Sequence, residues 1–131
     1  ACQKLAGRVP DAKLTACGTA DQASTARALE EASLLISAGA PGVQLVSTQD
    51  RQAISTLQVV IDLNAVPPLG IEGVKVTDKA TRLDGVVAYG AIGVGGTKME
   101  IHTAALKRLF RASDLVLDTE SIYRIGESLE S

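Results

Sequence analysis

Aromatic residues are scarce in this 131-residue sequence, which has no Trp, two Tyr and one Phe. Apolar residues nevertheless make up 46% of the chain, and its length corresponds to one domain at most. The hydrophobic core must therefore consist of Val, Ile, Leu and Ala side chains. Side chains of this kind favour a β-sheet with helices packed closely against it.

An excess of one charge and long apolar runs are also missing. The formal net charge is −2 and no Lys/Arg-rich run is present, which argues against non-specific nucleic-acid binding. No apolar run approaches the ~18 residues of a membrane-spanning helix. A membrane span is therefore not expected. The first residues also lack a charged region followed by an apolar core, so no secretory signal is expected.

Cysteine is rare as well, with Cys2 and Cys17 the two in the chain. They could pair in principle, but two cysteines in a chain of alternating helices and strands favour reduced thiols and a cytoplasmic location. Neither has another Cys or a His close by in the sequence, and no metal site is predicted.

Apolar periodicity and turn residues predict an alternation of strands and helices. The predicted strands are 13–17, 34–36, 58–62 and 86–89, with a short extended piece at 74–76. The predicted helices are 1–8, 19–32, 47–55, one ending at Phe110 and a last one after Asp118. The run at 34–36 is expected to be a parallel strand buried on both faces.

Capping residues indicate where three of these helices begin. Thr19 and Gln22 have the spacing of a capping box, with Thr19 as the cap. Ser47 opens a second helix, and Asp118 is the expected cap of the last one.

This succession predicts an α/β fold, a doubly wound parallel sheet with helices on both faces, because crossovers between parallel strands are right-handed. Ligands of such sheets bind beyond the carboxyl ends of the strands. Loops rich in Gly, Ala or Pro follow three predicted strands, at 37–42, 63–70 and 90–96. Each alone is an ordinary loop, but three at one edge favour a ligand-binding crevice.

Residues 86–110 combine a strand, a glycine-rich turn and a helix, a junction suited to an anion or a polarised carbonyl. Lys98 in the first helical turn opposes the helix dipole, so it is either an ordinary surface lysine or one directed at a substrate. His102 faces the same way and is interpreted as a surface or half-buried residue. The turn is not a phosphate loop, since Thr97 precedes Lys98, nor a dinucleotide fingerprint, since Lys98 replaces the third Gly.

Four segments carry a resemblance to a known family. They are Asp62-Leu-Asn-Ala-Val-Pro-Pro-Leu-Gly-Ile-Glu-Gly-Val, Thr77-Asp-Lys, Tyr89-Gly-Ala-Ile-Gly-Val-Gly-Gly-Thr-Lys98 with His102, and Asp118-Thr-Glu-Ser-Ile-Tyr123. Together they resemble the carboxyl-terminal part of NAD(P)-dependent methylene-tetrahydromethanopterin dehydrogenases. The resemblance is dense between residues 36 and 123, and it is specific because the Asn-Ala-x-Pro-Pro-Leu-Gly and Gly-Gly-x-Lys segments occur together at the family's separation.

The resemblance implies hydride transfer between NAD or NADP and methylene-tetrahydromethanopterin, or its tetrahydrofolate analogue, in one-carbon metabolism such as formaldehyde oxidation. The cofactor accepts the hydride, and the protein supplies position and electrostatics without a metal. Lys98 matches the family's active-site lysine near the pterin, whereas no catalytic role is carried over to His102. The residues expected to contact the cofactor are Ser37, Ala38, Gly39, Ala40, Asn64 and Ala65, with Gly93 and Gly95 facing the nicotinamide and the pterin.

Family members are longer, with an amino-terminal domain and a first strand–turn–helix unit that holds the cofactor diphosphate. Residues 1–131 are therefore expected to be the carboxyl-terminal portion of a Rossmann-like domain that lacks its first βαβ part, inactive alone and homo-oligomeric when full length. Two alternatives remain open. One is a non-catalytic module that binds a nucleotide or a partner, and the other is a half that works with a separate amino-terminal polypeptide.

Overall fold

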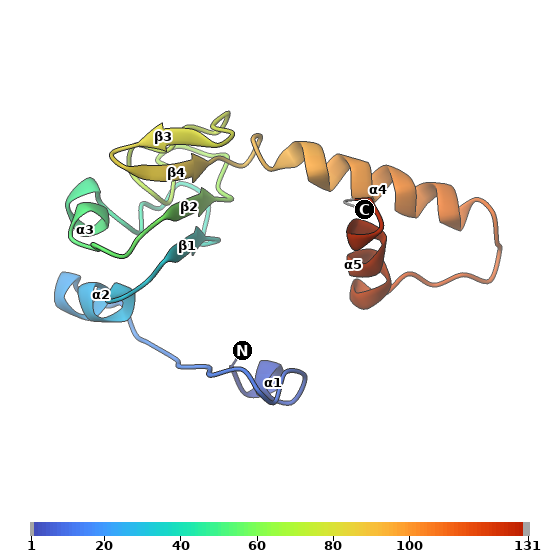
Figure 1. Ribbon diagram of the computed structural model, residues 1–131, viewed down its shortest axis with the longest axis horizontal. Coiled ribbons are helices and arrows are strands. Elements are labelled where there is room, and N and C mark those ends of the chain that lie inside the picture. Colours follow the sequence, from blue (N-terminus) through green and yellow to red (C-terminus); the bar gives the residue numbers. More distant parts are fainter. Residues whose placement is uncertain (1, 130–131) are drawn as a thin grey trace.

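The computed structural model describes residues 2–129 and contains a four-stranded sheet with the order β1-β2-β4-β3 (Figure 1). The strands are β1 Leu34–Ser37, β2 Val59–Asp62, β3 Thr81–Leu83 and β4 Val86–Tyr89. β1, β2 and β4 are parallel, and β3 is antiparallel to β4. The α/β class is confirmed, with a mostly parallel sheet in place of an entirely parallel one.

The core lies around β2 and β4, where Val60 and Ala88 are fully buried. Ile71, Val74 and Leu57 from the flanking loops complete it. Because these side chains are aliphatic, the core matches the composition expected of a chain with almost no aromatic residues. The three strand predictions at 34–36, 58–62 and 86–89 are confirmed.

Two strand predictions are wrong. Residues 13–17 belong to no strand, and nearly the whole stretch between residues 8 and 20 is exposed, so it has no neighbouring strand to pair with. The piece at 74–76 is a turn-containing loop that packs Val74 into the core. β1 is a strand as predicted, but it is an edge strand, and Leu34 and Ile36 are 50% and 53% exposed instead of buried.

β3 was not among the predicted strands, although the sequence carries its signal. Leu83 pairs with Val86 across the two-residue turn Asp84-Gly85. Both turn residues have positive φ, 46° and 90°, which is the backbone of a type I′ hairpin turn and the reason why Asp-Gly is favoured there.

The helices are α1 Cys2–Ala6, α2 Gln22–Leu29, α3 Thr48–Gln52, α4 Gly95–Leu109 and α5 Thr119–Glu127. Ser47 and Asp118 cap α3 and α5 as predicted. The predicted cap Thr19 is wrong, because Asp21 caps α2 and accepts a 2.7 Å hydrogen bond from the Ser24 backbone N–H. The Asp21 backbone N–H in turn donates to the Ser24 hydroxyl, and this reciprocal pair starts the helix later than expected.

α4 follows the carboxyl end of β4 and runs away from the sheet (Figure 1). α5 packs against α4. Ala105 and Ile125 are buried on these two helices, and a Cβ added at Gly126 would lie 3.1 Å from Ile101 Cδ1. The expected covering of both sheet faces by helices is therefore not confirmed for this pair. Among the described residues, no helix has the length and apolarity needed to cross a membrane.

Candidate functional site at the carboxyl edge of the sheet

The three parallel strands end side by side. Ser37 at the end of β1 pairs with Asp62 at the end of β2, and Ile61 pairs with Tyr89 at the end of β4. The loops at 37–42, 63–70 and 90–96 follow these residues, so the structure brings all three predicted loops to one edge. This is the edge at which open α/β sheets bind ligands.

Asp62 holds the backbone of the second loop through two hydrogen bonds to its carboxylate. Its side chain is fully buried, one carboxylate oxygen accepts the Asn64 N–H at 3.0 Å, and the other accepts the Ile71 N–H at 2.6 Å. Sequence reasoning placed Asp62 only at the end of a strand. The role in the loop has no local sequence signal, because Ile71 is brought to Asp62 by the fold of the loop.

The predicted residues Ser37 and Asn64 lie together beneath Gly70. These residues are 4% and 6% exposed, and neither Ser37 Oγ nor Asn64 Nδ2 has a hydrogen-bond partner in the part of the chain that the structure describes. A Cβ at Gly70 would overlap Ser37 Oγ and would lie 2.9 Å from Asn64 Nδ2. Only glycine allows the loop to approach the two polar groups this closely.

The remaining residues predicted for the first two loops lie at the surface. Ala38, Gly39, Ala40 and Ala65 are exposed. The edge therefore combines an exposed rim of small residues with two buried polar groups that lack partners. Such a combination suits a flat ligand with polar substituents, because small side chains allow close approach.

The glycine-rich turn is held by the loop at 75–78. Gly90 N donates to Asp78 O at 2.9 Å, and Ile92 N donates to Val76 O at 2.7 Å. A Cβ at Gly93 would overlap Asp78 O, whereas a Cβ at Gly95 would meet nothing within 4 Å. Of the two glycines predicted to face ligands, Gly93 thus packs on backbone and Gly95 adjoins open space.

Lys98 lies in the first turn of α4, with its N–H 3.5 Å from Val94 O, and its side chain is exposed. His102 is exposed one turn later. No side-chain hydrogen bond or ion pair joins either residue to another part of the described chain. Lys98 is therefore available to a ligand at the start of α4.

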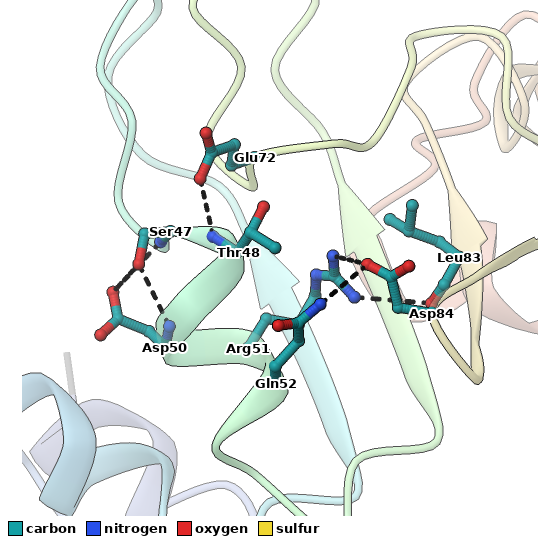
Figure 2. Close-up of polar contacts among 8 residues, drawn as sticks. All are labelled: Ser47, Thr48, Asp50, Arg51, Gln52, Glu72, Leu83 and Asp84. Carbon is teal, nitrogen blue, oxygen red and sulfur yellow. Dashed lines mark hydrogen bonds and ion pairs between the residues drawn. The ribbon is translucent and has the colours of Figure 1, made fainter.

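The carboxylates with lowered pKa values belong to the scaffold and not to this edge. Figure 2 shows Asp84 accepting hydrogen bonds from Arg51 at 2.8 Å and from Gln52 at 3.3 Å. The Arg51 hydrogen bond, followed by that of Gln52, lowers the pKa of Asp84 below its ordinary value. The Ser47 hydroxyl and backbone N–H lower the pKa of Asp50 in the same way at the start of α3.

A cleft of about 790 Å³ lies between α2 and α3, but none of the predicted site residues lines it. Within residues 2–129, no three His, Cys, Asp or Glu side chains gather in a way that suits a metal ion. Cys2 and Cys17 are both free. The carboxyl edge of the sheet is therefore the site that the sequence and the structure support together.

The fold is an α/β fold, and the three loops form a candidate ligand-binding site at the carboxyl edge of its sheet. The chain is 41% identical over 116 residues to "Bifunctional protein MdtA" of Methylorubrum extorquens, a match that covers 88% of this chain and 40% of that protein. It is 32% identical over 112 residues to the "NAD(P)-dependent methylenetetrahydromethanopterin dehydrogenase" of the same organism, covering 83% of this chain and 37% of the relative.

The predicted resemblance to the methylene-tetrahydromethanopterin dehydrogenases is confirmed over most of the chain. No protein-family model matches the sequence. The chain spans about two fifths of the length of the curated relatives it matches.

Proposed function

We propose that this chain forms the carboxyl-terminal, Rossmann-like part of an NAD(P)-dependent methylene-tetrahydromethanopterin dehydrogenase. The protein would transfer a hydride between NAD or NADP and methylene-tetrahydromethanopterin, or methylene-tetrahydrofolate, in cytoplasmic one-carbon oxidation. The complete protein is proposed to be a homo-oligomer. The observation that carries the proposal is the 32% identity to a dehydrogenase of this name over 112 residues. The match covers 83% of this chain, and any continuous stretch of that length includes the three edge loops.

The residues at the carboxyl edge of the sheet have a size and polarity that suit a nicotinamide cofactor. Ala38, Gly39, Ala40 and Ala65 supply an exposed rim of small residues, and Ser37 Oγ and Asn64 Nδ2 are buried polar atoms that lack partners among the described residues. When bound, the nicotinamide supplies the hydride chemistry. The chain's own residues would position the cofactor and exclude water on one side. Gly95, which adjoins open space, would face the nicotinamide and the pterin, and Gly93, packed against the Asp78 carbonyl, would hold the turn beside them.

Lys98 is proposed to hold the pterin next to the cofactor. Lys98 is exposed at the start of α4, directly after the loop that follows β4, and its ammonium has no partner among residues 2–129. A cation at this position opposes the helix dipole, and an electronegative group of the pterin would offset that cost. The role belongs to binding and electrostatics, so proton transfer is not assigned to Lys98.

The test is Lys98→Ala in the complete enzyme, with Lys107→Ala in the last turn of the same helix as the control. Removal of one electrostatic contact to a reacting substrate lowers turnover by about 10²–10³-fold. We expect that loss for Lys98→Ala, wild-type rates for Lys107→Ala, and melting temperatures close to wild type for both. The rate of NAD(P)H formation from methylene-tetrahydromethanopterin is the measurement.

Equal rates in the two variants would remove Lys98 from the site. A complete protein that binds NADPH but does not oxidise methylene-tetrahydromethanopterin or methylene-tetrahydrofolate would contradict the enzyme and favour the non-catalytic nucleotide-binding module.

A further inference from the structure

We infer that Asp62 is a positioning residue for the nicotinamide cofactor, because its carboxylate sets the backbone of the loop at 63–71. The inference rests on the proposed function and adds a residue that touches neither the cofactor nor the substrate. Asp62 acts through the peptide groups that it holds at the two ends of this loop.

Both carboxylate oxygens of Asp62 are used on backbone N–H groups of the same loop. Asn64 N donates to Oδ1 at 3.0 Å and Ile71 N donates to Oδ2 at 2.6 Å. The side chain is fully buried and forms no ion pair among the described residues. A buried carboxylate is unfavourable unless it is hydrogen-bonded, so this site is stable only while both ends of the loop stay in place.

The end of the loop is further attached to the chain that leads into α3. Gly70 O accepts the N–H groups of Leu45 at 2.8 Å and Val46 at 3.0 Å, and Glu72 N donates to Val46 O at 3.0 Å. Figure 2 shows that the Glu72 carboxylate also accepts the Thr48 N–H, at 2.7 Å. Asp62 therefore connects β2 to a backbone segment that is itself joined to the start of α3.

This geometry decides where the edge residues lie. Gly70 is held over Ser37 Oγ and Asn64 Nδ2 with no room for a Cβ, so a shift of the loop uncovers or displaces these two groups. Ala65 and the rim at 38–40 lie on the same two loops. Small displacements of positioning elements change binding and turnover strongly.

Asp62→Asn isolates this role, because it keeps the size of the side chain and replaces one acceptor oxygen by an NH₂ group. The NH₂ group would face either the Asn64 or the Ile71 N–H. Because both groups are donors, that hydrogen bond would be lost. Gly70→Ala displaces the loop by sterics without touching the carboxylate. Asp84→Asn is the matched control, since Asp84 also accepts two N–H donors, but at the β3–β4 turn.

The experiment measures the dissociation constants of NADPH and NADH, by their fluorescence on binding, and the melting temperature of the complete protein. We expect at least about tenfold weaker binding of the preferred nucleotide for Asp62→Asn and for Gly70→Ala. Asp84→Asn should lower the melting temperature and leave the dissociation constant within about twofold of wild type, because the turn lies outside the edge.

The inference is overturned if Asp62→Asn or, should that variant not fold, Gly70→Ala binds the nucleotide like wild type. It is also overturned if Asp84→Asn weakens binding as much as Asp62→Asn, since the effect would then follow from stability alone. A wild-type protein that binds neither NADPH nor NADH would instead overturn the proposed function, and the inference with it.

Discussion

Arg51 carries a positive charge into the interior, with a side chain that is 2% exposed. It donates to Asp84 at 2.8 Å and to the Leu83 carbonyl at 3.4 Å, and so ties α3 to the β3–β4 turn (Figure 2). Removal of one partner from a buried ion pair is destabilising because it leaves the other charge unpaired. Asp84 is half-exposed, which moderates the effect through solvent screening.

This pair predicts a pH dependence of stability. Arg51 lowers the pKa of Asp84, so the pair stabilises the protein above the pKa of an unfolded aspartate, about 3.9, and the contribution is lost as the pH falls through the lower folded-state value. The difference in urea midpoint between wild type and Asp84→Asn should be largest near neutral pH and should vanish in acid.

Asp114→Asn is the control for this measurement, since Asp114 is exposed and forms no hydrogen bond in the described chain. A wild-type advantage over Asp84→Asn that persists unchanged at the lowest pH would contradict the assignment of the pair as a stabilising contact.

Residues of the candidate site and of the scaffold differ in how far the sequence could predict them. The family resemblance predicts Ser37 and Asn64 as cofactor residues, and both also lie in loops that follow predicted parallel strands. The contact of Arg51 with Asp84 and the contact of Asp62 with Ile71 were not predictable, because they depend on how loops fold back and not on local periodicity.

At the scale of elements, the loop at 75–78 and the glycine-rich turn form one unit. A Cβ at Gly90 would overlap Lys75 O and lie 2.6 Å from the Val76 carbonyl carbon, and both obstacles are backbone. Gly96, in the first turn of α4, has nothing within 4 Å of the corresponding position.

These two glycines predict opposite effects of the same substitution. Gly90→Ala should lower the free energy of unfolding by about 1–3 kcal/mol, because the loop must shift to admit the methyl group. Gly96→Ala should raise it by about 0.5–1 kcal/mol, because alanine is the better helix former. Urea unfolding of both variants is the measurement, and a Gly90→Ala protein as stable as wild type would show that the two segments are not packed as described.

The elements that were predicted correctly have strong local signals. Ser47 and Asp118 cap helices through their own side chains, and the aliphatic runs form β1, β2 and β4. Thr19 failed as a cap because Asp21 offered a second, competing capping box two residues later. β3 has no periodicity signal, because it has three residues of which two are exposed, and the Asp84-Gly85 turn is its one local indication.

At the scale of the whole molecule, burial is unevenly distributed. The sheet holds the core, whereas α4 leads away from it and exposes Met99, Leu106 and Phe110. β1 is an edge strand of the described sheet, and Leu34 and Ile36 are exposed on it. The backbone groups of an edge strand favour pairing with another strand. Helix positions relative to a sheet depend on contacts between distant segments, so the sequence pattern predicted the α4 helix but not where it lies.

The last prediction concerns the 131-residue chain as a separate polypeptide. We expect no dehydrogenase activity and weak binding of NADPH and NADH, because the resemblance assigns the diphosphate-holding turn to sequence outside these residues. The purified chain and the complete enzyme should be compared for NAD(P)H formation from methylene-tetrahydromethanopterin. Turnover by the 131-residue chain alone would contradict this expectation.

The Asp84-Gly85 turn also sets a sequence of events for the assembly of the sheet. Leu83 and Val86 meet across two residues, whereas Leu34 pairs with Val59, and Val59 with Val87, across 25 and 28 positions. Loop-closure entropy makes the short connection the least costly to form, and hairpins close within about 1–10 μs. We therefore expect the β3–β4 hairpin to form before the two parallel pairings, and the candidate ligand-binding edge to form only once β1 and β2 have joined it.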